Sequence, residues 1–248
     1  MTLNTTEDLA AALIAAHDGG PLIDSVPAHL RPVDMPAVVA LQDMIVDRIG
    51  AVGGWKVMAG GTGEPLCAPI PTNRYFADGE TIDAARHRLV LVELEIGVKL
   101  GQDLAADADL AAVEAAIASI HPTLELIGSP FVDRDAVDFN TKLADLQSNG
   151  CVVVGQAMEG LAKNAFSTLM AELTFDGTVA TTAGGGASWQ AILEALRWLA
   201  SHSASRGLQL RQGQVIITGS RVIAPIGQAR LIQGQLGLEG TVAARIQS

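Results

Sequence analysis

The sequence predicts an α+β domain that is rich in short strands and has two helices at its amino terminus. Two amphipathic helical patterns come first, within residues 1–52. From residue 53 to residue 248 the pattern changes to short apolar runs separated by Gly, Pro and Asp turns, which is typical of strands. These runs do not alternate regularly with helices of crossover length, which argues against a Rossmann sheet or a TIM barrel. We therefore expect an amino-terminal helical cap and a β-rich domain in one compact unit.

The two amino-terminal helices have sequence signals at their ends. Thr5 or Thr6 can cap the first helix, whose apolar stripe stops before the glycine pair at 19–20. Asp34 can cap the second helix, and Pro36 suits its first turn. Both patterns therefore predict helices with defined ends.

Turn residues bound each expected strand of the β-rich domain. Two further helices interrupt the strands, one from Asp107 or Asp109 to Ile120 and one from near Ser188 to Gly207. The tail alternates around glycines, which predicts a hairpin. The strands are expected at residues 55–58, 81–82, 89–100, 123–127, 151–154, 173–175 and 215–218, and the hairpin within 228–246.

Composition narrows the class of partner. A chain of 248 residues can form one substantial core. Its 27 acidic and 16 basic residues give a net charge of -11, which disfavours nucleic-acid phosphates or an anionic membrane surface. We expect a soluble enzyme that acts on small molecules.

Cysteine usage and the amino terminus predict the compartment. Cys67 and Cys151 are far apart and form no Cys-x-x-Cys pair, so we expect no disulfide framework and a reducing environment. The amino terminus has no basic segment, and its apolar stretch at 9–16 is too short to span a bilayer. The expected location is the cytoplasm.

Two glutamates lie two residues apart in residues 88–100, the most apolar strand-like run of the chain. Because strand side chains alternate between faces, Glu93 and Glu95 project from one face and Val92 and Leu94 from the other. Neighbouring carboxylates repel each other and, if buried, also lose hydration, unless a metal, a proton or an Arg compensates. A divalent cation would resolve both costs.

The alternative for this run is an amphipathic strand whose polar face meets water. A third carboxylate favours the metal interpretation, because Glu125 also stands alone among apolar neighbours in an expected strand. No Cys or His shares the pattern, so the donors are hard oxygen atoms. The sequence therefore predicts one Mg²⁺ or Mn²⁺ site at Glu93, Glu95 and Glu125.

Lys56 is the unusual member of the chain's four lysines, since it is embedded in the apolar run Gly53-Gly-Trp-Lys-Val-Met58. One interpretation is a lysine at a strand end that reaches solvent along its apolar stem. The functional interpretation is a cation that faces an anionic substrate or an enolate, with a pKa lowered by burial.

Other motifs are less specific. The glycine clusters at 60–63 and 184–186 lack P-loop and Rossmann spacing, so we expect loops. The five histidines have no zinc-protease spacing, and Ser220 lacks the Gly-x-Ser-x-Gly frame of serine hydrolases. The turn Thr218-Gly-Ser220 either offers hydroxyl and amide donors to an anion or is an ordinary turn. Asp78, before Gly79, is by itself a turn aspartate.

Read in order, six segments resemble the 2-keto-4-pentenoate hydratase and 4-oxalocrotonate decarboxylase family of the fumarylacetoacetate hydrolase superfamily. The order of Gly-Trp-Lys, Glu-x-Glu and a later lone Glu is more specific than any one of these motifs. The segments are Gly54-Trp-Lys-Val57, residues 92–104, residues 121–127, residues 143–145 with 148–155, Trp198-Leu-Ala200 and residues 213–220.

This resemblance covers nearly the whole chain and implies several properties. It implies a mixed β-roll, a homo-oligomer, and a Mg²⁺ or Mn²⁺ held by the three glutamates. It also implies that residues 53–248 form the catalytic domain. The residues that it places at the substrate are Lys56 and Asp78 for proton transfer, and Ser148, Thr218, Gly219 and Ser220 for binding.

Two segments depart from the family pattern. The family often has Ala-Asp-Asn-x-Ser where this chain has Ala144-Asp-Leu-Gln-Ser148. It often has a Gly-His-Pro or Gly-Asn-Pro turn where this chain has Gly184-Gly-Gly-Ala-Ser-Trp189. The metal site is retained, while polar groups that would shape the pocket differ.

The resemblance implies a metal-dependent lyase of small 2-oxo acids. The first hypothesis is hydration of 2-hydroxypenta-2,4-dienoate to 4-hydroxy-2-oxopentanoate through a metal-stabilised enolate. The second is decarboxylation of the 4-oxalocrotonate type, because the same metal site serves both reactions. Hydrolysis of an acylpyruvate comes third, since the chain has no His-x-x-Glu segment. The last hypothesis is a catalytically silent protein that binds a ligand or assembles with a pathway enzyme.

Overall fold

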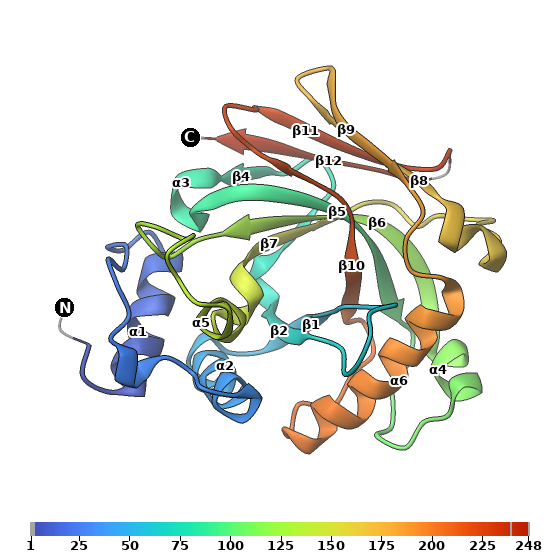
Figure 1. The fold of residues 1–248 in the computed structure, drawn as a ribbon. Helices are drawn as coiled ribbons and strands as arrows, with labels where there is room; N and C mark the ends of the chain where they lie inside the picture. The colour runs from blue at the N-terminus through green and yellow to red at the C-terminus, as the bar shows by residue number, and fades with distance from the viewer. Residues whose placement is uncertain (1–2, 239, 248) are drawn as a thin grey trace.

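The computed structural model describes residues 3–238 and 240–247. Two β-sheets form its centre, and helices lie on two sides of them (Figure 1). The larger sheet has the order β2-β1-β10-β5-β6-β7-β3, and the smaller sheet has the order β4-β12-β11-β8-β9. The pairs β1/β10, β3/β7 and β4/β12 are parallel, and the other pairs are antiparallel. This mixed arrangement confirms the predicted α+β class.

The elements follow in chain order. The α-helices are α1 (Thr6–His17), α2 (Met35–Ile49), α3 (Ala84–His87), α4 (Leu110–Ala116), α5 (Phe139–Ala144) and α6 (Trp189–Ser205). The strands are β1 (Val52–Val57), β2 (Cys67–Pro71), β3 (Tyr75–Ala77), β4 (Thr81–Asp83), β5 (Leu89–Leu100), β6 (Ile117–Gly128), β7 (Asn149–Val154), β8 (Met170–Phe175), β9 (Thr178–Gly184), β10 (Val215–Pro225), β11 (Leu231–Leu236) and β12 (Gly240–Gln247).

Both amino-terminal helices begin where the sequence predicts. The Thr5 hydroxyl accepts a hydrogen bond from the Asp8 amide, and the Asp8 carboxylate accepts one from the Thr5 amide, which completes a capping box. The Asp34 carboxylate accepts a hydrogen bond from the Ala37 amide at the start of α2. These caps satisfy amide groups that have no partner inside the helix.

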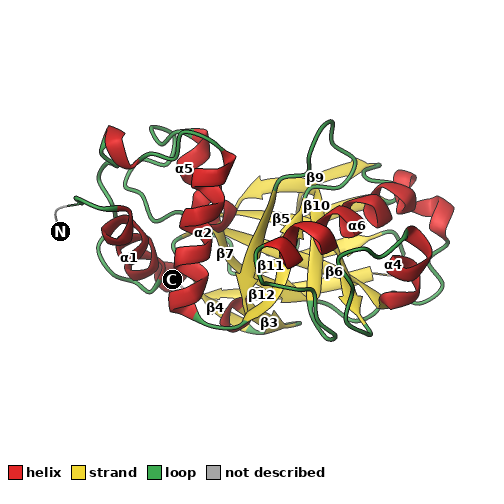
Figure 2. Cartoon of the chain, turned by 90° about the horizontal axis from the view of Figure 1, so that it is seen from below, coloured by secondary structure: helices red, strands yellow, loops and turns green. Residues whose placement is uncertain are grey.

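The helical layer includes more than residues 1–52. Helices α1 and α2 share an apolar core with α5 and with Phe131, Leu143 and Leu146, which come from the segment between β6 and β7. A buried contact of 2.8 Å between His17 Nε2 and Asp145 Oδ1 joins the same two parts of the chain. Figure 2 shows α1, α2 and α5 together at one end of the molecule and α4 and α6 at the other. The amino-terminal helical cap therefore also contains α5 and the rest of the segment that connects β6 to β7.

The predicted helix that ends at Ile120 is too long. Helix α4 ends at Ala116, and residues 117–120 belong to β6, where Ile120 pairs with Val98 of β5. The helical pattern is local, whereas the strand is stabilised by pairing across the sheet. The strand expected at 215–218 is longer for the same reason, because β10 follows β5 as far as Pro225.

The main core lies between the two sheets. Val92, Leu94 and Ile96 of β5 are fully buried in it, together with residues of β8, β11 and β12. At Gly234 of β11, a Cβ atom would lie 2.6 Å from a terminal methyl carbon of Leu94, so a larger residue would force the side chains between the sheets to shift. The residues of β5 that alternate with this apolar face include Glu93 and Glu95, which therefore face away from the smaller sheet.

Cys67 and Cys151 are free, and both are buried. Burial raises the pKa of the Cys67 thiol to about 12, so it stays protonated near neutral pH. Within the described residues, no helix has the length and apolar character needed to cross a membrane.

Candidate metal centre

Strand pairing brings three glutamates to one point on the larger sheet. Glu93 of β5 lies directly opposite Glu125 of β6, and Glu95 follows two residues later on the same face of β5. One carboxylate oxygen from each residue lies within 4.8 Å of the corresponding oxygen of the other two. Like charges that face each other across a sheet destabilise it. The structure therefore concentrates negative charge where strand pairing alone would disfavour it.

Burial intensifies this repulsion. Glu125 is fully buried, and Glu95 is only 1% exposed. Burial, with the nearby carboxylates of Glu125 and Glu93, raises the pKa of Glu95 well above its ordinary value. The pKa of Glu93 is raised for the same two reasons, burial first and Glu125 second. Without a cation, the cluster therefore favours proton uptake.

Lys56 of β1 supplies a positive charge to this cluster. Its Nζ atom donates to both carboxylate oxygens of Glu125, at 2.7 and 2.6 Å. Burial lowers the pKa of Lys56, but attraction to Glu125, Glu93 and Glu95 outweighs burial, and the pKa is raised. This result corrects the expectation of a lowered pKa. One ammonium group faces three carboxylates, so an excess of negative charge remains.

The segment before β7 holds the other side of Glu125. The Asn149 side chain is fully buried, and its Nδ2 atom donates to Glu125 Oε1 at 2.8 Å. Leu146, Gln147 and Ser148 have φ values of 47°, 55° and 59°. Such left-handed conformations cost on the order of 1–3 kcal/mol for residues other than glycine, and they cluster at functional sites. Sequence analysis included Ser148 but missed Asn149, whose position beside Glu125 depends on the fold.

A bulge in β10 positions an amide beside Glu95. The register of β10 against β5 shifts around Ser220, and Gly219 has a φ of 103°, which favours glycine. The Gly219 amide donates to Glu95 Oε2 at 2.6 Å. The Thr218 hydroxyl instead donates to the Ile96 carbonyl oxygen, and the Ser220 hydroxyl donates to the Val222 carbonyl oxygen. Gly219 and Ser220 line the pocket, whereas Thr218 supports the bulge.

A cavity of about 380 Å³ lies over this cluster. Glu93, Glu95 and Lys56 line it together with Ser148, Gly219 and Ser220, so most of the site residues expected from the sequence meet here. The cavity has two further cations, Arg134 and Lys142, which sequence analysis did not identify. Lys142 is one of only four lysines in the chain, and that scarcity is a signal that could have found it.

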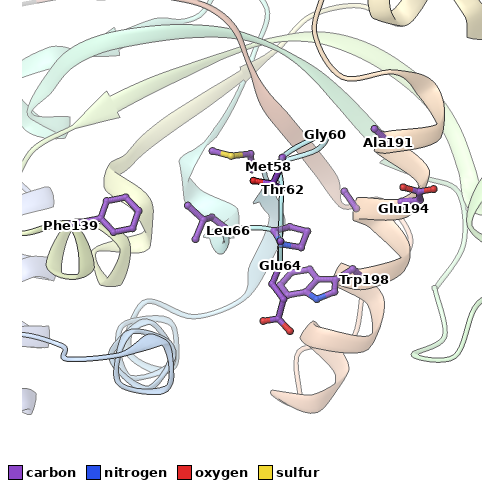
Figure 3. Close-up of a pocket in the computed structure, with 13 residues that line it drawn as sticks. Met58, Gly60, Thr62, Glu64, Leu66, Phe139, Ala191, Glu194 and Trp198 are labelled. Atoms are coloured by element: carbon purple, nitrogen blue, oxygen red, sulfur yellow. The ribbon is translucent and has the colours of Figure 1, made fainter.

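A second hollow, of about 630 Å³, shares lining residues with the first. Figure 3 shows the residues that line this second hollow. It lies between the glycine loop at 60–63 and helix α6, where Trp198 and Glu194 line it. Met58, Leu66 and Phe139 line both cavities, so the loop that joins Met58 to Leu66 forms part of the wall between them.

Asp78 lies outside the metal-site cavity. Its carboxylate accepts a hydrogen bond of 2.7 Å from the Ala243 amide, and it lines a separate surface hollow with Glu172 and Gln233 of the smaller sheet. The turn interpretation from sequence describes this position, because Gly79 follows with a φ of 78°. The structure therefore does not bring Asp78 together with the other expected site residues, and its catalytic role stays a prediction.

The altered segment at 184–189 packs against Arg221. The Arg221 guanidinium donates to the carbonyl oxygens of Gly185 and Ala187 at 2.9 Å. A Cβ atom on Gly186 would lie 2.7 Å from that guanidinium. The glycines therefore allow the loop to close around a half-buried arginine in place of the turn that the family often has.

The residues present fit a divalent cation. The donors are carboxylate oxygens, which Mg²⁺ and similar hard cations prefer. Among the described residues, the only group of three or more His, Cys, Asp or Glu side chains close enough to bind one ion is Glu93, Glu95 and Glu125. Burial and the neighbouring carboxylates raise the pKa values of Glu93 and Glu95, and a bound cation would offset both effects.

Comparison with known proteins agrees with the sequence resemblance. The chain is 28% identical over 233 residues to the 2-keto-4-pentenoate hydratase of Paraburkholderia xenovorans, covering 89% of this chain and 86% of the relative. The resemblance to the hydratase and decarboxylase family is confirmed. No protein-family model matches the sequence.

Solved structures show the same fold. 4-Oxalocrotonate decarboxylase from Pseudomonas putida G7, in a complex with magnesium and adipate, matches with a TM-score of 0.80 and 23% identity, covering 99% of both chains. A Yersinia pestis protein that is ascribed to the fumarylacetoacetate hydrolase family matches with a TM-score of 0.56 and 18% identity. The match covers 78% of this chain and 92% of the other. The predicted β-roll of the fumarylacetoacetate hydrolase type is therefore confirmed.

Proposed function

We propose that this protein is a metal-dependent lyase of small 2-oxo acids, with Mg²⁺ or Mn²⁺ bound by Glu93, Glu95 and Glu125. The observation that carries this proposal is the convergence of three carboxylates beside a cavity, two of them at most 1% exposed, with the ammonium group of Lys56 bound to one of them, Glu125. Hydration of 2-hydroxypenta-2,4-dienoate to 4-hydroxy-2-oxopentanoate is the leading reaction, because the hydratase of Paraburkholderia xenovorans aligns over most of both chains.

The bound cation would supply positive charge to stabilise the negative charge that develops on a 2-oxo acid in its enolate form. Lys56 donates to both carboxylate oxygens of Glu125 and lines the cavity, so it would offer an ammonium group to the substrate and assist proton transfer. The Gly219 amide and the Asn149 side chain hold Glu95 and Glu125 in place. Ser148 and Ser220 contribute to the polar lining.

Decarboxylation of the 4-oxalocrotonate type is the second candidate, since the same site would stabilise the enolate that loss of carbon dioxide leaves. Two cations of the cavity, Arg134 and Lys142, favour a substrate with additional negative charge. Acylpyruvate hydrolysis ranks below both reactions, because the chain has no His-x-x-Glu segment to activate a water molecule.

We also propose that the protein is a homo-oligomer and is located in the cytoplasm. The helical layer presents exposed large apolar side chains at Val33, Val132 and Phe139. The Asn140 side chain donates to the Pro32 carbonyl oxygen, which brings the two segments that carry these residues together. Contact with another copy, or with a pathway enzyme, would cover such side chains. Size-exclusion chromatography with light scattering tests the oligomer, and a monomer at all concentrations would contradict it.

Substrate turnover tests the proposed reaction. Protein loaded with Mg²⁺ is incubated with 2-hydroxypenta-2,4-dienoate, and 4-hydroxy-2-oxopentanoate is followed by NMR, with 4-oxalocrotonate and carbon dioxide release in a parallel assay. We expect turnover of at least one substrate that stops when EDTA is added. No turnover of either substrate by protein that binds Mg²⁺ would contradict the proposal and favour the silent binding protein.

A further inference from the structure

We infer that His17 and Arg74 are positioning residues of the metal centre, although neither lines its cavity. They hold the two ends of residues 145–149 (the strained segment), which contacts Lys56 and Glu125. This inference rests on the proposed function, in which Lys56 and Glu125 serve the reaction. It extends that function by giving the amino-terminal helix α1 a role in the geometry of the site.

The strained segment has an unfavourable backbone conformation. Leu146, Gln147 and Ser148 are three consecutive residues with positive φ values, and none of them is a glycine. Residues with a side chain keep such conformations only where the surrounding structure holds them. Inside the segment, the Ser148 amide donates to the Asp145 carbonyl oxygen at 2.8 Å, and the Asn149 amide donates to the Leu146 carbonyl oxygen. Because a change to an ordinary conformation would relieve the strain, contacts from outside the segment are needed to hold it.

His17, the last residue of α1, holds the first end of the strained segment. Its Nε2 atom lies 2.8 Å from Asp145 Oδ1. His17 is 6% exposed and Asp145 is 1% exposed, so water does not replace this contact. Among residues 3–238 and 240–247, His17 is the only hydrogen-bond partner of the Asp145 carboxylate, because Oδ2 has none. A buried carboxylate that loses its one partner is strongly destabilised, so without His17 the Asp145 side chain would move toward water.

Arg74 holds the other end of the strained segment. Its Nη1 atom donates to the backbone carbonyl oxygen of Asn149. Asn149 is fully buried and Arg74 is 7% exposed, so this charged hydrogen bond is also shielded from water. Burial lowers the pKa of Arg74, and the negative charge of Asp145 is the strongest of the effects that oppose this lowering. The guanidinium is therefore attracted to both ends of the segment.

The strained segment in turn contacts both charged groups of the site. The Asn149 side chain donates to Glu125 Oε1 at 2.8 Å, and Lys56 Nζ donates to the Gln147 carbonyl oxygen at 3.4 Å. Gln147 and Ser148 also line the cavity. If the segment relaxed, Glu125 would lose a buried amide donor and Lys56 would lose an acceptor that helps to fix its direction. The two positioning residues therefore act on the reaction through this segment.

Hydrogen exchange of the metal-free protein tests the positioning directly. Mass spectrometry follows the peptides that contain the Ser148 and Asn149 amides. In His17→Leu, which removes the donor to Asp145, exchange of these amides should be about tenfold faster or more. His17→Gln keeps an N–H donor on its side chain and should stay within about twofold of the unaltered protein. Leu9→Ala is the matched control, because Leu9 is fully buried on the same helix and in the same apolar core; it should speed exchange in α1 and not in the strained segment.

Turnover of the 2-oxo acid substrates by the Mg²⁺-loaded variants provides the catalytic readout. In His17→Leu, kcat should fall by about tenfold or more while KM changes by less than about threefold, because Lys56 and Glu125 lose their alignment rather than their contact with substrate. His17→Gln and Leu9→Ala should keep kcat within about twofold. Arg74→Met should resemble His17→Leu, and Arg74→Lys should restore part of the loss, since an ammonium group can still donate to one carbonyl oxygen.

If His17→Leu does not fold, His17→Leu/Asp145→Asn takes its place, because it leaves no unpaired buried charge; the same faster exchange and lower kcat are expected of it. Exchange at Ser148 and Asn149 that is unchanged in the folded variant, or an equal loss of kcat in Leu9→Ala, would overturn the inference. If the unaltered protein turns over a substrate and the variant matches it in both readouts, the inference fails and the proposed function stands. If exchange is faster in the variant but the unaltered protein turns over neither substrate, the proposed function fails and the positioning role stands.

Discussion

Replacing Glu95 with Gln should weaken metal binding and at the same time stabilise the metal-free protein. The carboxylate oxygens of Glu93, Glu95 and Glu125 lie within 4.8 Å of one another. At that separation two unit charges repel by about 3.5 kcal/mol if the effective dielectric constant is about 20. Lys56 contacts Glu125 directly, so the repulsion between Glu93 and Glu95 is the least compensated. Glutamine keeps the shape of the side chain and can still accept the hydrogen bond from Gly219.

The gain in stability should be smaller than the full repulsion, because the raised pKa of Glu95 allows the metal-free site to take up a proton. A bound proton already removes part of the repulsion in the unaltered protein. We therefore expect the free energy of unfolding of metal-free Glu95→Gln to exceed that of the unaltered protein by about 1–2 kcal/mol. Mg²⁺ affinity should fall by at least about 100-fold, which corresponds to about 2.7 kcal/mol.

Two measurements check this prediction on one preparation. Urea unfolding in EDTA gives the stability of the metal-free protein, and isothermal titration gives the Mg²⁺ affinity. Glu172→Gln is the matched control, because Glu172 lies on strand β8 and outside the metal-site cavity. Unchanged Mg²⁺ affinity in Glu95→Gln would refute the metal site, and a metal-free variant less stable than the unaltered protein would refute the argument from repulsion.

Three further predictions concern the surroundings of the cluster. Lys56→Met leaves the buried Glu125 without its cation and should destabilise the metal-free protein by about 3 kcal/mol in urea unfolding. Mg²⁺ should restore most of this loss. If it does not, Lys56 and the metal do not compensate the same carboxylates. Gly54→Ala places a Cβ atom 1.9 Å from a carbonyl oxygen of β10 and should cost about 3 kcal/mol or more, whereas Gly61→Ala, with only ordinary contacts, should change stability by less than about 0.5 kcal/mol. The pKa of Glu95 is raised in the folded metal-free protein, which therefore binds more protons than the unfolded chain, and its free energy of unfolding should fall as the pH rises above 4.5. Urea unfolding at several pH values, for the unaltered protein and for Glu95→Gln, checks this prediction. The same dependence of unfolding free energy on pH in both proteins would contradict it.

Local signals were enough to predict parts of the fold. The caps at Thr5 and Asp34 satisfy amides within a few residues, so the starts of α1 and α2 follow from short patterns. Strand β5 has the predicted bounds because its apolar alternation is long. The end of α4 was missed, since the pairing of residues 117–120 with β5 involves a strand that is distant in sequence. Strand β9 was also missed, because it is an exposed run without large buried side chains.

The candidate site also combines features that local sequence patterns predict with contacts between residues that are distant in sequence. The shared face of Glu93 and Glu95 follows from the period of a strand, and the structure places Glu125 opposite Glu93. The contact of Lys56 with Glu125 spans 69 residues, and the one between Asn149 and Glu125 depends on the pairing of β6 with β7. No local pattern encodes either contact.

Calorimetric titration of oxalate, with and without Mg²⁺, tests the central claim most directly, because oxalate mimics the chelating end of a 2-oxo acid enolate. The account predicts that oxalate binds to the Mg²⁺-loaded protein and loses at least tenfold in affinity when EDTA removes the metal. Oxalate affinity that is the same in Mg²⁺ and in EDTA would contradict a metal centre at Glu93, Glu95 and Glu125 and, with it, the proposed lyase.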